Sequence, residues 1–160
     1  MKNNKTVIAF TDGSCNWKNG LGGSGVYLTY LSKKKTISKG YKSTKTGRME
    51  IKALILALRA IKNKKDYKIL IYSDSKYVIN SVMKNWVFNW ESFQFVGKAN
   101  EDLWRQFLVE YRKFPPGSVE LRHVKGHTGK QDFISKGNEM ADVLADYKTQ
   151  EKYIDDIYLD

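Results

Sequence analysis

Four acidic residues stand where apolar segments of the chain end or where helical patterns lie. Asp12 follows the apolar run TVIAFT, and Asp74 follows a second run, KILIYS. Glu50 stands in the first turn of a stretch with helical periodicity, and Asp142 stands in the last such stretch. If the two apolar runs are neighbouring parallel strands, Asp12 and Asp74 reach one sheet edge, where open α/β sheets bind ligands.

The chemistry expected of such a cluster depends on divalent cations. Carboxylates brought together repel one another, and one of them normally keeps its proton. Hard cations such as Mg²⁺ remove this repulsion, because they take oxygen ligands and keep several waters. Two ions about 4 Å apart can activate a water and stabilise the leaving oxygen of a phosphodiester. Taken singly, each acidic residue also fits an ordinary role as a turn former, a helix cap or a solvated side chain.

The charge of the chain indicates a polyanionic partner. The formal net charge is +11, and the last ten residues are acidic, so residues 1–150 are more basic still. A body this basic attracts polyanions, of which nucleic acid is the commonest. A lysine-rich solvated surface that keeps the protein soluble is the alternative.

The length and composition favour one soluble domain. A chain of 160 residues suits a single core, and its one cysteine, Cys15, excludes an intramolecular disulfide. No apolar stretch approaches the roughly 20 residues that span a bilayer, and no signal peptide is recognised. We expect a cytoplasmic monomer with a single catalytic domain over residues 1–150 and an acidic tail over 151–160.

Apolar periodicity predicts a mixed α/β (α+β) fold. We expect strands at 6–11, 24–31, 35–41, 68–73 and 118–124, and helices at 48–64, 75–84, 101–113 and 138–149. The first three strands connect without a helix, which favours an antiparallel meander. A helix then separates the third strand from the fourth, which favours a parallel crossover. The expected architecture is a five-stranded mixed sheet with flanking helices.

Five sequence blocks carry a resemblance to a known family. In order, they read TDGSC, GRMEIKAL, YSDSKYV, HVKGHTG and GNEMADVLA. Over about Val7 to Asp146 the chain closely resembles type 1 ribonuclease H. The resemblance implies the ribonuclease H-like fold and endonucleolytic cleavage of the RNA strand of RNA–DNA hybrids, leaving 5′-phosphate and 3′-hydroxyl ends. It also implies two Mg²⁺ ions, with Mn²⁺ able to substitute. The residues that match the family's metal-binding and catalytic carboxylates are Asp12, Glu50, Asp74 and Asp142.

One histidine matches a catalytic position of the family. His127, in KGHTG, corresponds to a residue on a mobile loop that assists the attacking water or product release. An imidazole near neutrality can accept and return a proton. A loop histidine that hydrogen-bonds its own backbone is the alternative, and His123, in the apolar strand, is interpreted as structural. The long segment between His127 and Asn138 is either a mobile flap or a surface insertion.

The resemblance also implies contacts to the minor groove of the hybrid, where 2′-hydroxyls mark the RNA strand. The candidate substrate-binding residues are Gly13, Ser14, Cys15, Asn19, Thr44, Lys45, Thr46, Arg48, Lys76, Trp86, Trp90 and Asn138. Cys15 is equally consistent with a small buried residue, and the two tryptophans with packing between helices.

The chain departs from the family pattern in three places. Thr46 and Gly47 stand where many members carry two asparagines, and Lys76 stands where a glutamine is frequent. The segment from Lys84 to Asp102, strongly basic in well-known bacterial members, holds two lysines against three acidic residues. We therefore expect hybrid binding to depend more on other basic stretches, such as 33–35 and 62–65.

Two other functions remain open from the sequence. One is a non-catalytic module that binds hybrids, although a binder gains nothing from clustered negative charge beside a polyanion. The other is a nuclease or integrase-like enzyme of the same general fold with a different substrate.

Overall fold

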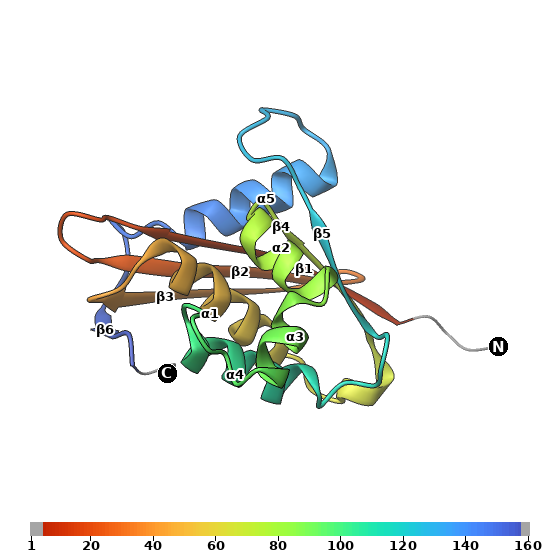
Figure 1. The fold of residues 1–160 in the computed structure, drawn as a ribbon. Helices are drawn as coiled ribbons and strands as arrows, with labels where there is room; N and C mark the ends of the chain where they lie inside the picture. The colour runs from red at the N-terminus through yellow and green to blue at the C-terminus, as the bar shows by residue number, and fades with distance from the viewer. Residues whose placement is uncertain (1–4, 158–160) are drawn as a thin grey trace.

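A six-stranded mixed sheet forms the centre of the protein, in a computed structural model that describes residues 5–157 (Figure 1). The strands are β1 (Thr6–Cys15), β2 (Gly22–Tyr30), β3 (Lys33–Lys42), β4 (Lys68–Ser73), β5 (Val119–His123) and β6 (Tyr153–Asp155). Their order across the sheet is β5-β4-β1-β2-β3-β6. The β1–β2 and β2–β3 pairs are antiparallel, whereas β1–β4, β4–β5 and β3–β6 are parallel. The predicted mixed sheet is confirmed, with a sixth strand that the sequence analysis missed.

Helices cover both faces of the sheet. They are α1 (Thr46–Arg59), α2 (Lys76–Met83), α3 (Trp86–Ser92), α4 (Glu101–Tyr111) and α5 (Phe133–Leu144), with a short 3₁₀ turn, η1, at Lys64–Asp66. Figure 1 shows α1 and α4 on one side of the sheet and α5 on the other. The larger core lies between the sheet and α1, and a smaller core around Phe10 lies beneath α5. Within residues 5–157 no helix combines the length and apolarity that crossing a membrane requires.

Helix α1 is buried on more than the one face that periodicity predicts. Ile51, Leu54, Ile55 and Leu58 have no exposed surface, as expected of the sheet-facing stripe. Helix α4 also packs on α1, and Lys52 is fully buried as well, with its ammonium beside Asp156 and over the Tyr41 ring. The helix ends at Arg59, before the predicted 64, and the Lys64 ammonium donates hydrogen bonds to the carbonyls of residues 58 and 61. These bonds tie η1 to the end of α1.

Helix α5 begins earlier than predicted. The sequence analysis placed it at 138–149, whereas it runs from Phe133 to Leu144. The Asp132 carboxylate accepts hydrogen bonds from the Ser135 backbone N–H at 2.9 Å and from its hydroxyl at 3.1 Å, which caps the first turn. The second half of the segment between His127 and Asn138 is therefore helical, and Asn138 itself lies within the helix.

The C-terminal segment is part of the fold rather than a free acidic tail. Strand β6 pairs in parallel with β3, with Tyr153 opposite Gly40 and Asp155 opposite Lys42. The next residue, Asp156, is 7% exposed and reaches α1. The acidic segment predicted at 151–160 is thus attached to the sheet through Tyr153–Asp155, a pairing of which charge alone gives no sign; Asp160 lies outside the described residues.

Close packing of α5 on the sheet gives a stability prediction at Gly137. A Cβ atom there would lie 2.3 Å from the Phe10 ring, so Gly137→Ala forces α5 off the sheet. We expect a loss of about 1–3 kcal/mol in the free energy of unfolding, measured by urea denaturation. Gly47→Ala is the matched control, because its new Cβ would meet nothing nearer than Tyr77 at 3.6 Å. Equal losses in the two variants would contradict the packing argument.

Candidate active site

The two aspartates at strand ends lie at the same edge of the sheet. Strands β1 and β4 are parallel, and their register pairs Phe10 with Tyr72. Asp12 and Asp74 each follow two residues later, so the fold brings them to one edge, as the sequence predicts. Glu50 comes from the first turns of α1, and Asp142 comes from α5 on the other face of the sheet.

These four carboxyl groups act on one another electrostatically. Burial, the charge of Asp74 and a hydrogen bond with Asp142 raise the pKa of Asp12 to about 8. Burial and the charge of Asp142 raise the pKa of Asp74 above its usual range. Burial, assisted by Asp74, also raises the pKa of Glu50. Asp74 and Asp142 therefore act on Asp12, and Asp74 also acts on Glu50. The four residues form one electrostatic cluster.

Some members of the cluster are held by hydrogen bonds within the protein. The Ser75 hydroxyl donates to Glu50 Oε2 at 2.5 Å, and the Gly13 N–H donates to Asp12 Oδ1 at 2.9 Å. In residues 5–157 no three His, Cys, Asp or Glu side chains stand together in an arrangement that could hold a metal ion. The carboxylates are thus neighbours, but they are not preset as a closed cage.

The donor set nevertheless fits a hard divalent cation. All four side chains offer oxygen, the ligand that Mg²⁺ and Mn²⁺ prefer. Asn138 is 4% exposed and hydrogen-bonds Asp74, which lowers the pKa of that carboxyl against the stronger effect of burial. Its Oδ1 atom is buried and has no hydrogen-bond partner among the described residues. An acceptor left in this state next to clustered carboxylates matches a site that receives a cation with its waters.

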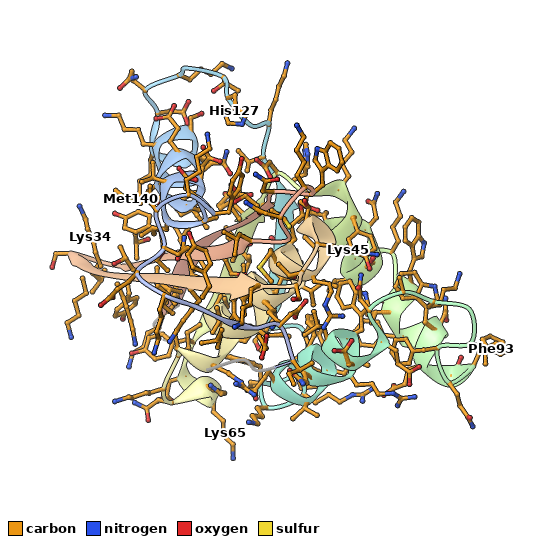
Figure 2. All side chains as sticks on the ribbon, turned by 90° about the vertical axis from the view of Figure 1, so that its left-hand side faces the viewer. Lys34, Lys45, Lys65, Phe93, His127 and Met140 are labelled. Atoms are coloured by element: carbon orange, nitrogen blue, oxygen red, sulfur yellow. The ribbon has the colours of Figure 1, made fainter. Side chains whose placement is uncertain are left out.

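His127 lies on the loop between β5 and α5, close to Asp74. It has a positive φ of 54° and is exposed, and Figure 2 shows it on the outlying loop at the top of the molecule. The preceding residue passes directly beside the carboxylate, since a Cβ on Gly126 would lie 2.8 Å from Asp74 Oδ2. The charge of His127 favours the ionised form of Asp74.

His123 differs from its sequence interpretation as a structural residue. It is exposed at the end of β5, and its charge also favours ionised Asp74. Ser75 and His123 are the neighbours of the cluster that sequence reasoning did not assign to the site. The only signal available was their adjacency to the end of a strand.

Several predicted substrate-binding side chains at the end of β1 are engaged within the protein. Ser14 Oγ donates to the carbonyl of residue 145 at 2.5 Å, and Asn19 Oδ1 accepts from the N–H of residue 21 at 3.0 Å. Cys15 Sγ donates to the carbonyl of Thr44 at 3.4 Å, and burial raises the pKa of this thiol. Gly13 allows close approach of two elements, because a Cβ there would lie 2.4 Å from the N atom of Glu50.

At the start of α1 the candidates divide into two groups. Thr44 and Arg48 are bound to Asp156, by Oγ1 at 2.7 Å and by Nε at 2.5 Å. Lys45 and Thr46 are exposed, as is Lys76 at the first position of α2. The cavity bordered by Ser43, Thr44, Lys45, Arg48, Asn100, Asp156 and Ile157 has a volume of about 520 Å³.

The two tryptophans of α3 differ in how exposed they are. Trp90 is half-buried and packs edge-on against Trp104, with ring centroids 6.2 Å apart. Trp86 is 40% exposed, and the Lys84 ammonium lies 5.5 Å from its ring centroid. The packing alternative therefore holds for Trp90, while Trp86 remains available for contact.

The lysines at 33–35 and 62–65 do not border the carboxylates. Lys33, Lys35 and Lys62 line a cavity with Val7, at the opposite end of β1 from Asp12. Five residues of strand correspond to about 17 Å. The expectation that hybrid binding depends more on these stretches than on the segment 84–102 stays a prediction.

Comparison with known proteins points to one family. The family model described as RNase H matches residues 4–150. Ribonuclease H of Actinobacillus succinogenes is 38% identical over 157 residues, 95% of each chain, and that of Francisella philomiragia is 42% identical over 149 residues, 90% of each. The crystal structure of LC9-RNase H1, titled a type 1 RNase H with the type 2 active-site motif, is 26% identical with a TM-score of 0.74. It covers 89% of this chain and 71% of that one. The PFV RNase H domain, 24% identical with a TM-score of 0.72, covers 89% and 93% and supports the fold alone.

Proposed function

The chain belongs to the ribonuclease H family, and on this premise we propose that it is a metal-dependent endonuclease that hydrolyses the RNA strand of RNA–DNA hybrids. The expected products carry 5′-phosphate and 3′-hydroxyl ends. The observation that carries the proposal is the burial of Asp12 beside Asp74 and Asp142 in an otherwise basic protein. Holding carboxylates together in this way opposes folding, so a binding module without catalysis has no use for it.

The family is metal-dependent, and we infer that Asp12, Glu50, Asp74 and Asp142 hold two Mg²⁺ ions, for which Mn²⁺ can substitute. When bound, such ions neutralise the cluster and activate water for attack on phosphorus. The chain itself orients the ligands. Ser75 fixes Glu50, and Asn138 fixes Asp74. The burial of Asp12 excludes bulk water from the centre of the cluster, which strengthens every electrostatic interaction there.

We assign proton transfer or product release to His127. Its exposed position beside Asp74 lets the imidazole accept a proton from the attacking water or release one to the leaving oxygen. The loop that carries it connects two fixed elements, β5 and the capped start of α5.

The hybrid is proposed to lie across the edge that carries the carboxylates. The exposed side chains of Lys45, Thr46, Lys76 and Trp86 are available for direct contact. Other candidates are proposed to act mainly through backbone groups or by positioning their neighbours. These are Gly13, Ser14, Cys15, Asn19, Trp90 and Asn138. Thr44 and Arg48 are proposed to shape the groove through their bonds to Asp156. The enzyme is further proposed to act as a cytoplasmic monomer.

A substrate panel tests this proposal directly. We expect cleavage of a labelled RNA–DNA hybrid in the RNA strand alone, dependent on Mg²⁺ and abolished by chelator. Duplex RNA, duplex DNA and single strands should remain intact, because only the hybrid combines 2′-hydroxyls on one strand with their absence on the other. Gel analysis of end-labelled strands is the measurement. Binding without cleavage would favour the non-catalytic module, and cleavage of duplex DNA would favour a different nuclease of this fold.

A further inference from the structure

The turn that joins β1 to β2 presents a tryptophan to solvent near the edge that carries the carboxylates. Trp17 is 85% exposed, which leaves a large apolar ring in water. Asp12 lies on β1, and Trp17 follows the end of that strand by two residues. Three residues of strand, or about 10 Å, and one step of the turn therefore separate them. A side chain in this position can contact a molecule that occupies the carboxylate edge.

Hydrogen bonds hold this turn in one shape. The backbone N–H groups of Asn16 and Gly20 donate to the carbonyls of residues 21 and 16, each at 2.8 Å. Two asparagine side chains close the turn further. Asn16 Oδ1 accepts from the N–H of residue 18 at 2.9 Å, and Asn19 Oδ1 accepts from the N–H of residue 21 at 3.0 Å. Trp17 is thus carried on a fixed backbone, so little conformational freedom is lost when it makes a contact.

The turn is also attached to the segment that precedes α1. The Thr44 N–H donates to the Gly20 carbonyl at 3.1 Å, and the Thr44 carbonyl accepts from the thiol at the end of β1 at 3.4 Å. Thr44 in turn borders the cavity of about 520 Å³ whose lining includes Lys45 and Arg48. The turn therefore adjoins both the strand of Asp12 and a cavity with cationic side chains.

A cation accompanies the indole ring. The Lys18 ammonium lies 5.5 Å from the centroid of the Trp17 ring, within the range of a cation–π interaction. Both side chains are exposed, and the ion pairs found among residues 5–157 do not include Lys18. The two residues together offer one flat apolar face and one positive charge. This combination suits a ligand that presents sugar rings and phosphates side by side.

We propose, on the basis of the proposed function, that the Trp17 ring lies in the minor groove of the hybrid against its sugars, and that Lys18 binds a neighbouring phosphate. An RNA–DNA hybrid has A-form geometry, and the A-form minor groove is wide, shallow and lined with 2′-hydroxyls. The minor groove of B-form DNA is only about 6 Å wide. A ring on a fixed turn fits the first groove and is too broad to lie flat in the second. Trp17 therefore reads the shape of the duplex and favours the hybrid over duplex DNA.

Fluorescence anisotropy of a fluorescein-labelled hybrid tests this role on the full chain, with Mg²⁺ present and Asp12→Asn in every protein to prevent cleavage. Trp17→Ala should weaken hybrid binding by roughly tenfold, as loss of an aromatic contact to nucleic acid does. Binding to duplex DNA of the same sequence should change less than about twofold, because the ring does not enter that groove. Trp17→Phe keeps a flat ring and should bind the hybrid within about threefold of the parent protein. Lys18→Ala should reduce the salt dependence of hybrid binding by about one phosphate contact.

Leu31 provides the matched control. It is 86% exposed and also lies at a hairpin turn, between β2 and β3. The nine residues of β2 separate its turn from that of Trp17 by about 30 Å. Leu31→Ala should bind hybrid and duplex DNA as the parent protein does. Thermal unfolding should give the same midpoint for both alanine variants, because each side chain is exposed.

Three binding results would overturn the role of Trp17. They are unchanged hybrid affinity in Trp17→Ala, equal weakening for hybrid and duplex DNA, and equal weakening in Leu31→Ala. Kinetics with Asp12 intact separate this role from the proposed function. Trp17→Ala should raise KM by roughly tenfold with kcat nearly unchanged, as loss of a binding contact does. Absence of cleavage by the unaltered chain would contradict the proposed function, whereas cleavage with an unchanged KM in Trp17→Ala would contradict the role of Trp17 alone.

Discussion

Asp12→Asn is expected to abolish hybrid cleavage and, at the same time, to raise the thermal stability of the metal-free protein at pH 8. Burial and the neighbouring carboxyls raise the pKa of Asp12 from its ordinary value near 3.8 to about 8. A raised carboxyl pKa means that the folded state binds a proton more tightly than the unfolded chain. This residue's contribution is therefore fully favourable below about pH 4 and is lost as the pH rises through 8. The asparagine amide is neutral, like the protonated carboxyl, so the variant keeps this stability as the pH rises.

The stability gain is on the order of a few kcal/mol at pH 8 and vanishes near pH 4. Circular dichroism melts at both pH values, with chelator, measure it. Mg²⁺ should stabilise the wild type more than the variant, because cations that bind the folded state raise its stability. Cleavage should fall by roughly three orders of magnitude or more.

Glu139→Gln is the matched control for Asp12→Asn. Glu139 is exposed on α5, one turn before Asp142, and should change activity less than about twofold. An Asp12→Asn variant that keeps cleaving, or that is less stable than wild type at pH 8 without metal, contradicts the assignment of this cluster.

Asp156→Ala is expected to cost about 3–5 kcal/mol of unfolding free energy, as removal of one partner from a buried ion pair does. The Asp156 carboxylate accepts from Lys52 Nζ at 2.7 Å and from Arg48 Nε at 2.5 Å, and Lys52 has no exposed surface. Although burial acts in the opposite direction, bonds from Arg48, Lys52 and Thr44 hold the pKa of Asp156 below its usual range. The stabilisation is therefore present above about pH 4 and is lost as the pH falls through the lowered pKa.

Urea denaturation at pH 7 measures the effect, and Asp155→Ala is its control. Asp155 precedes the buried residue, is about half exposed, and lies 4.0 Å from Lys42. Its loss should cost less than about 1 kcal/mol. Similar losses in the two variants would show that the network around Asp156 contributes no more than a surface pair.

Local patterns predicted the parts of the fold that they encode. The alternation and the apolar runs located the first five strands, and the spacing of Ile51, Leu54, Ile55 and Leu58 located α1. Predicting that Asp12 and Asp74 lie close together required only that β1 and β4 be recognised as neighbouring parallel strands. The resemblance to a family supplied the roles of Glu50, Asp142 and His127, which spacing alone leaves open.

Features that depend on distant partners were not predictable in this way. A lysine at position 52 is read as solvent-exposed until Asp156, 104 residues away, is known to meet it. The start of α5 was missed because its capping residue, Asp132, lies in a polar segment that resembles a loop. The hydrogen bonds of the Ser14 and Thr44 hydroxyls likewise depend on partners far along the chain, the carbonyl of residue 145 and the carboxylate of Asp156.

The bond between α1 and β6 also couples two distant parts of the chain during folding. Lys52 sits in the central helix, yet the carboxylate that it pairs with comes 104 residues later. A lysine ammonium without its partner resists enclosure in an apolar core. Full burial of α1 therefore requires that the segment carrying Asp156 first pairs with β3.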